Sequence, residues 1–197
     1  MRRAAGFALA LLALLPIEDA SAHPPFAGAI GFYGGLLHPL FVPTHTLAIL
    51  GLGLFIGQQT PRGRWSAAVA YATGLGAGCA AMLSAFAPQV AAETLLAAAA
   101  VCGALVALAR KVPLLIACVL ALVIGLALAL DSPPGGISVR DANVTLLGTF
   151  CGAVILLLAV LQVVAILRRD WQRLGMRIVG SWIAASAILV LAFKVSR

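Results

Sequence analysis

Charged residues are scarce in this chain of 197 residues: they make up 10% of it, and only six are acidic. A soluble globular domain has about 25% charged residues, so the composition argues against a water-soluble protein. The hydrophobic residues, 63% of the chain, stand in long runs without the two-residue alternation of barrel strands. In bilayer hydrocarbon, such runs satisfy their backbone polar groups as helices. We therefore expect an all-α polytopic membrane helix bundle.

The sequence is also poor in groups that carry out chemistry. Its four cysteines form no CxxC pair and fall inside apolar runs, which excludes a disulfide framework or a zinc knuckle and is typical of small buried side chains. It has no nucleophile–base pair, no paired carboxylates and no phosphate-binding loop. We expect no enzyme activity, no catalytic residue and no bound cofactor.

The formal net charge of +7 would suggest nucleic-acid binding in a soluble protein. Here, however, the basic residues lie in short clusters between apolar runs, as the positive-inside rule describes. We expect the lipid bilayer as a partner, and no nucleic acid.

The first 22 residues have the pattern of a secretory signal peptide. Two arginines precede an apolar core at 4–15, and the small residues at 20–22 form a cleavage site. Cleavage after Ala22 would make His23 the mature N-terminus and leave 23–197 as a single transmembrane helical domain. An uncleaved signal anchor is the alternative.

After the signal, apolar blocks predict about six transmembrane helices. The first block is too long for one simple helix, and Pro39 and Pro43 predict a break within it. Gly74, Gly76 and Gly78 predict close approach of a neighbouring helix. The blocks cover residues 27–57, 65–86, 91–109, 112–130, 144–167 and 178–193.

Loop charge predicts the orientation of these blocks. The first, third and fifth connections are basic, whereas the alternate ones hold Arg140 beside Asp131 and Asp141. With the basic connections in the cytoplasm, both mature termini lie outside the inner membrane of a bacterium. The basic connections contain Arg62 and Arg64, then Arg110 and Lys111, then Arg168, Arg169, Arg173 and Arg177.

Two histidines in the first block are the main candidates for a functional site. On a straight helix, His38 and His45 would lie about 10.5 Å apart along the axis, too far to share one metal ion. The prolines between them remove this objection, because broken helices at membrane depth form ion sites. The alternative is a pair of neutral histidines hydrogen-bonded to backbone carbonyls.

Two further residues are weaker candidates. As a mature N-terminus, His23 would offer an α-amine beside an imidazole, a pair that can chelate a divalent metal, or it could be incidental to cleavage. Glu93 opens the block at 91–109, where a carboxylate either stabilises the helix N-terminus or supplies an anionic ligand.

The first block resembles the HupE/UreJ family of hydrogenase and urease accessory proteins, which carries a GF…HPL…DHLLAM stretch in its first membrane segment. The matching residues are Gly31-Phe32, Gly35, His38-Pro39-Leu40, His45, Leu47, Ala48 and Gly53-Leu54. Weaker matches follow at Glu93, Leu96-Ala97, Gly103, Gly175 and Gly180. A signal peptide, about six spans and a histidine just after cleavage are also similar to the family.

The chain departs from the family pattern where the family has polar residues. Thr44 replaces the Asp before the second histidine, Val42 stands at a glycine position, and Pro43 is an addition. The family's later HG-x-AHG-x-E stretch would fall near 124–131. Only Gly125, Ala127 and acidic Asp131 match it, while Ile124, Leu126 and Leu128 occupy the histidine positions.

The resemblance implies a membrane permease for nickel or cobalt that supports metalloenzyme maturation. It implies His38 and His45 as metal ligands, Glu93 as a charge near the outer mouth and His23 as an external ligand. Further partners would be the maturation machinery or a second copy of the chain. The alternative is a non-transporting accessory or assembly protein of the same fold, which the missing histidines favour. A third hypothesis, a soft-metal site, would use Cys79, Cys102, Cys118, Cys151 and Met82.

Overall fold

The computed structural model describes residues 31–83, 90–133 and 138–196, and this part of the chain consists of α-helices. The predicted signal peptide and His23 lie outside the described residues. The helices are α2 (Phe32–Phe41), α3 (Pro43–Gly57), α4 (Pro61–Leu83), α5 (Ala91–Ala107), α6 (Leu114–Leu130), α7 (Val139–Ile166) and α8 (Asp170–Val195).

Each apolar block forms a helix, and the first block forms two. Helices α4, α7 and α8 begin before their apolar runs do, because residues at their N-termini favour the start of a helix. Pro61 opens α4, where a proline costs nothing because the first amides have no helical partner. Ser138 caps α7 by accepting a hydrogen bond from the amide of Asp141. The charged residues of the predicted connections therefore lie partly in first helical turns.

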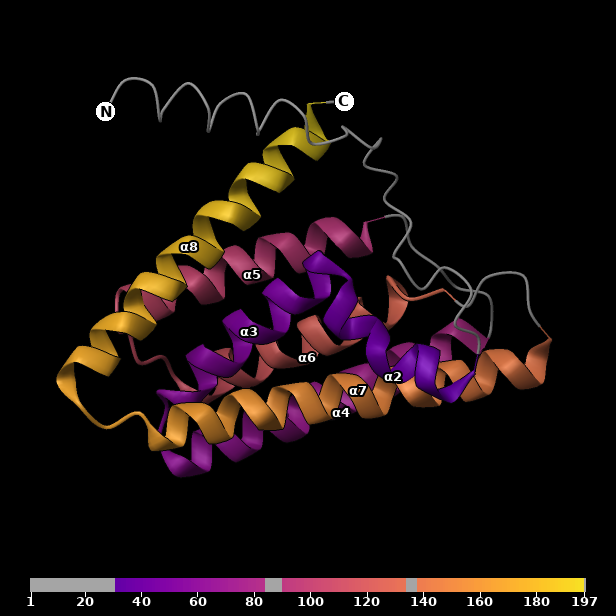
Figure 1. The fold of residues 1–197 in the computed structure, drawn as a ribbon, viewed down its shortest axis with the longest axis horizontal. Helices are drawn as coiled ribbons and strands as arrows, with labels where there is room; N and C mark the ends of the chain where they lie inside the picture. Colours follow the sequence, from indigo (N-terminus) through magenta and orange to yellow (C-terminus); the bar gives the residue numbers. More distant parts are fainter. Residues whose placement is uncertain (1–30, 84–89, 134–137, 197) are drawn as a thin grey trace, which may run out of the picture.

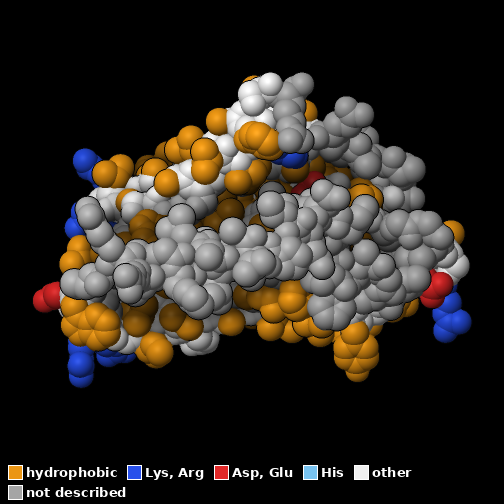
Figure 2. Space-filling model, turned by 45° about the horizontal axis from the view of Figure 1, so that its top comes forward, with side chains coloured by type: hydrophobic (Ala, Val, Ile, Leu, Met, Phe, Trp, Pro, Cys, Tyr) orange, Lys and Arg blue, Asp and Glu red, His pale blue; other side chains and the backbone are white. Residues whose placement is uncertain are grey.

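Length and composition identify the helices that can cross a bilayer. Among the described residues, α7 and α8 are long and apolar enough, and the bent pair α2 and α3 qualifies as one further span. The apolar helices α5 and α6 have 17 residues each, or about 25 Å of helix. Hydrophobic side chains cover much of the visible surface, and most visible Lys and Arg atoms lie at its left-hand end (Figure 2). The predicted helical membrane bundle is confirmed.

Helix α3 is the centre of the bundle. It contacts every other described helix, and Figure 1 shows it between α5 and α7. Ten of its 15 residues are buried, and they face all sides of the helix. A helix that is apolar all round is buried all round, and α3 therefore has protein neighbours where an outer helix would have lipid.

The other helices pair through glycine: α2 with α7, α4 with α6, and α5 with α8. A Cβ on Gly35 would overlap the carbonyl of Thr145, and one on Gly152 would overlap the carbonyl of Leu36. Gly103 and Gly180 face each other's backbone in the same way across α5 and α8. Without a side chain at these positions, the backbones approach each other directly.

The glycines predicted to allow close approach lie on α4. Gly74 and Gly78 meet the backbone of α6, as predicted. A Cβ on Gly76 would meet only a ring carbon of Phe150 at 3.8 Å, an ordinary contact. The prediction is thus confirmed for the two glycines that face α6.

The predicted break of the first span is present. Helices α2 and α3 meet at 72°, and the break falls at Val42, while Pro39 stays inside α2 and Pro43 begins α3. Pro43 has no amide hydrogen, so it cannot continue the hydrogen bonds of α2. The hydroxyl of Thr46 lies 3.0 Å from the carbonyl oxygen of Pro39 and 2.9 Å from that of Leu40, and so serves the carbonyls that the break frees.

Candidate metal site at the helix break

The break brings the two predicted histidines together. The ring centroids of His38, on α2, and His45, on α3, are 5.1 Å apart, with the rings edge to face. On an unbroken helix they would be about 10.5 Å apart along the axis. The bend at Val42 therefore brings the two histidines close together, as the prolines between them were predicted to allow.

A carboxylate from another helix joins the pair. Asp131 follows the last residue of α6, and its Oδ2 lies 3.0 Å from Nε2 of His45. The side chain of His45 is 0% exposed and that of Asp131 is 25% exposed. Because an ionised carboxylate only accepts hydrogen bonds, Nε2 of His45 is the donor, and the neutral ring then has an unprotonated Nδ1.

Two ring nitrogens in this cluster are left without partners. Nε2 of His38 and Nδ1 of His45 are both buried and have no hydrogen-bond partner among the described residues. Buried polar atoms are usually paired, so an exception requires an explanation. A neutral imidazole nitrogen is the commonest protein ligand for transition metals, and a carboxylate behind a histidine is a common means of orienting it toward a metal.

Helix ends add negative potential to the same region. Asp131 sits at the C-terminus of α6, where the helix dipole already contributes partial negative charge. At the break, the C-terminus of α2 adds partial negative charge, which the N-terminus of α3 offsets at His45. A carboxylate at a helix C-terminus is unfavourable unless a hydrogen-bond donor or cation compensates for it, and here His45 does so. Asp131 is thus the charged group that favours a cation beside His45.

The cluster does not form a complete multidentate cage. In the described ranges, no three His, Cys, Asp or Glu side chains lie close enough together to hold one metal ion. The direct donors at the break are therefore two imidazole nitrogens, while Asp131 acts through His45. Any ion held there would keep other ligands, such as water.

Glu93 lies elsewhere. It occupies the first turn of α5, and its Oε1 accepts a hydrogen bond of 2.9 Å from Nζ of Lys194, in the last turn of α8. The carboxylate is near a helix N-terminus and the ammonium near a helix C-terminus, so both charges suit the helix dipoles. Its observed partner is thus Lys194, with no ion pair or hydrogen bond to His38 or His45 in the described part.

In the part of the chain that the structure describes, the four cysteines of the soft-metal hypothesis form no group of three metal-binding side chains. All four are free thiols, with Cys102 buried and the others partly buried.

Sequence reasoning missed two residues of this site. It placed Asp131 in an outer connection and matched it to the acidic residue of the family's HG-x-AHG-x-E stretch without giving it a role beside the histidines, and it did not single out Thr46. A signal for Asp131 was present, since a lone acid directly after an apolar helix opposes the helix dipole and calls for a cationic or donor partner. Nothing in the sequence identified that partner as His45, which lies 86 positions away.

Comparison with known proteins identifies a family. No curated protein and no solved structure matches the chain. A family model described as HupE / UreJ protein matches residues 9–190, which is nearly the whole chain and includes the histidine pair, Asp131 and all the described helices up to the last turns of α8. This chain therefore belongs to the HupE/UreJ family of membrane proteins.

Proposed function

We propose that this protein is a membrane permease for a divalent transition metal, nickel or cobalt, that supports metalloenzyme maturation. The observation that carries the proposal is the pair of buried, unpartnered ring nitrogens on His38 and His45 at the broken helix. Membership in the HupE/UreJ family, which is linked to nickel and cobalt, supports it.

In this proposal, His38 and His45 bind the passing ion through Nε2 and Nδ1, and Asp131 holds the ring of His45 in the orientation and protonation state that binding needs. Two imidazole ligands bind a metal ion less tightly than a complete set of protein ligands does. Weak binding suits a permease, because an ion that is to cross must also leave.

The proposed setting is the inner membrane of a bacterium. The basic connections would face the cytoplasm and both mature termini the outside. Glu93 would then lie near the outer mouth as part of an ion pair with Lys194, and His23 would collect metal outside if the signal is cleaved. The bilayer and the transported ion would be the immediate partners, with the maturation machinery or a second copy as further ones.

The small donor set favours a second candidate. With no group of three metal-binding side chains among the described residues, the protein could instead be an accessory or assembly protein of the same fold that has lost transport. In that case the histidine pair would serve only to hold the helix break in place.

Uptake of radiolabelled nickel and cobalt separates the two candidates. Cells that lack their own uptake systems would express the wild type, His38→Ala, His45→Ala or Thr44→Ala at matched membrane levels. Thr44, beside His45 on α3, is the matched control. The permease predicts uptake above empty vector that both histidine variants abolish and the control retains.

The same variants in proteoliposomes test the protein alone. Entry of nickel or cobalt into vesicles that contain a metal-sensitive dye would show that no other component is needed. If the verified wild type moved neither ion in cells or vesicles, the permease proposal would fail and the accessory candidate would replace it. Co-purification from the membrane would then identify its partner.

A further inference from the structure

A basic cavity lies at the end of the bundle away from the histidine pair. It has a volume of about 560 Å³, and residues from the connections α3–α4, α5–α6 and α7–α8 line it. These are the three connections that the sequence marked as basic. The fold thus brings to one place charges that are up to 113 positions apart, from Arg64 to Arg177.

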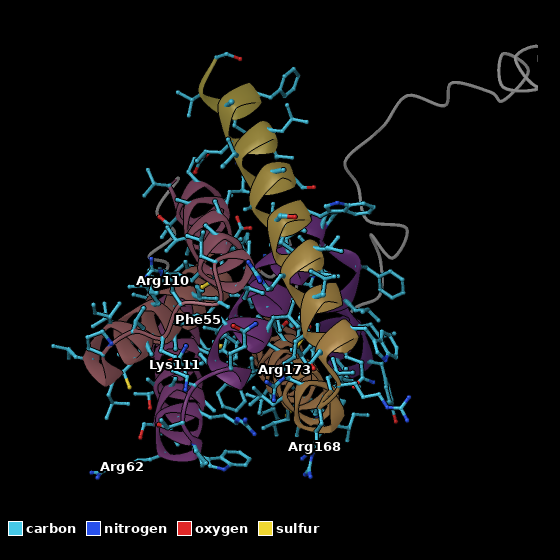
Figure 3. All side chains as sticks on the ribbon, turned by 90° about the vertical axis from the view of Figure 1, so that its left-hand side faces the viewer. Phe55, Arg62, Arg110, Lys111, Arg168 and Arg173 are labelled. Atoms are coloured by element: carbon cyan, nitrogen blue, oxygen red, sulfur yellow. The ribbon has the colours of Figure 1, made fainter. Side chains whose placement is uncertain are left out.

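Five cationic side chains line this basic cavity, and no Asp or Glu does: Arg64, Lys111, Arg168, Arg173 and Arg177. Figure 3 looks at this end of the molecule, where Lys111 is labelled on the α5–α6 connection and Arg168 and Arg173 are labelled around the α7–α8 connection. Like charges held around one cavity repel each other, and an anion bound between them would offset that repulsion.

Of the four carboxylates in the described part of the chain, three are engaged elsewhere, and the fourth, Asp170 at the start of α8, forms no ion pair with a described cation. Among the described residues, the ion pairs are His45 with Asp131 and Lys194 with Glu93. Asp141 is hydrogen-bonded to Ser138 at the start of α7. None of the five cavity cations has a carboxylate within 4.0 Å in the described part of the chain, so their charge is available to a ligand.

Two of the arginines are held in position by the protein itself. Arg64 donates from Nη2 to the carbonyl of Gly57 at 2.7 Å, and Arg177 donates from Nε to the carbonyl of Ala107 at 2.8 Å. Each bond uses one of the five N–H donors of a guanidinium and leaves the others. Nε of Arg64 is buried and has no partner among the described residues. These two guanidiniums therefore lose little freedom when they bind a ligand.

We infer that the basic cavity binds a phosphate group, carried either by the headgroup of an anionic phospholipid or by free phosphate. Planar guanidiniums match phosphate oxygens in pairs. The five cations line the cavity together with the apolar Val164, Leu167 and Met176, which suit the start of an acyl chain. By the positive-inside rule, this end is the one expected at the cytoplasmic leaflet, where basic pockets between helices bind anionic headgroups. This inference does not depend on metal transport.

Binding to the full-length chain, purified in detergent, tests the inference. Native mass spectrometry would measure the fraction bound to phosphatidylglycerol, with zwitterionic phosphatidylcholine as the reference lipid. A thermal shift titration with inorganic phosphate would be the second arm. The test variant is Arg168→Gln with Arg173→Gln, two exposed side chains that make no hydrogen bond within the described structure. The matched control is Arg62→Gln with Arg110→Gln, which removes the same charge from the same end but outside the cavity (Figure 3).

We expect phosphatidylglycerol to bind better than phosphatidylcholine, and the cavity variant to weaken that binding by about tenfold or more. The control should stay near the wild-type value. If only inorganic phosphate binds, with the same dependence on the cavity, the ligand is free phosphate. Equal losses in both double variants would attribute binding to general surface charge and overturn the inference. Failure of the wild type to bind either ligand would overturn it as well.

Discussion

Replacing Asp131 by Asn removes a charge from the histidine pair while keeping the size of the side chain. The hydrogen bond to His45 is 3.0 Å long, and His45 is fully buried. Asn can also present its NH₂ group to Nε2, which would move the ring proton to Nδ1, the atom proposed to bind metal. The substitution therefore perturbs both the basicity and the protonation state of the ligand.

The expected loss follows from the contact. Breaking a hydrogen bond between a buried group and a charged partner costs about 1–3 kcal/mol. Loss of the carboxylate behind a metal-binding histidine lowers affinity about 10–100-fold, or about 1.4–2.7 kcal/mol. The first figure concerns the stability of the folded protein, whereas the second concerns metal affinity and sets the expected effect on uptake. The half-saturating nickel concentration for uptake should therefore rise about 10–100-fold in Asp131→Asn.

The assay is the initial rate of nickel uptake against nickel concentration at matched membrane levels. Asp141→Asn is the control, because Asp141 is an exposed carboxylate bonded to Ser138 at the start of α7. It should leave the curve unchanged. A thermal shift measurement would show whether Asp131→Asn still folds. If the folded variant kept the wild-type curve while His45→Ala lost uptake, the role assigned to Asp131 would be refuted.

Three further predictions concern stability, measured by thermal unfolding in detergent. Gly152→Ala, at a backbone contact between α2 and α7, should destabilise the protein by about 1–3 kcal/mol. Gly175→Ala, where a Cβ meets open space, should be neutral or should stabilise the protein by up to about 1 kcal/mol. Equal effects of the two substitutions would contradict the packing described for Gly152. Ala109 has a left-handed backbone conformation, with φ 49°, which costs a residue with a Cβ about 1 kcal/mol. Ala109→Gly should therefore stabilise the protein by about 1 kcal/mol, and a loss of stability would contradict this. Glu93→Gln and Lys194→Met should each cost less than about 1 kcal/mol of stability, because the pair is partly exposed. Both variants should leave nickel uptake intact, and a loss of uptake in Glu93→Gln alone would show that Glu93 also serves the ion.

The sequence predicted the helices well, because the length of an apolar run determines a membrane helix almost alone. It also predicted the break and the meeting of His38 and His45, since a proline between them removes backbone hydrogen bonds whatever the surroundings are. It gave Pro39 and Pro43 equal weight, however, and the break falls beside Pro43. The hydroxyl of Thr46 completes the break, and such a contact across the bend becomes visible only in three dimensions.

The partner of each helix could not be predicted in this way. Hydropathy describes helices one at a time, whereas α2 pairs with α7 and α5 pairs with α8 through contacts between distant segments. For the same reason, sequence reasoning matched Asp131 to a family motif but did not connect it with His45. Its contact with His45 depends on how α6 lies against α3, and the ends of apolar runs carry no information about that.

The glycine contacts have a mechanical consequence. Within each of the three glycine-packed pairs, main chain touches main chain, so sliding one helix past its partner would drive backbone atoms into each other. Helix α3 meets α7 through the side chains of Val160 and Val164, which lie against Gly53 and Gly57. Each glycine-packed pair should therefore move as one rigid body. His38 lies on α2, which is locked to α7, whereas His45 lies on the central α3. The distance between the two histidine rings can therefore change only if the α2–α7 pair moves as a whole against α3.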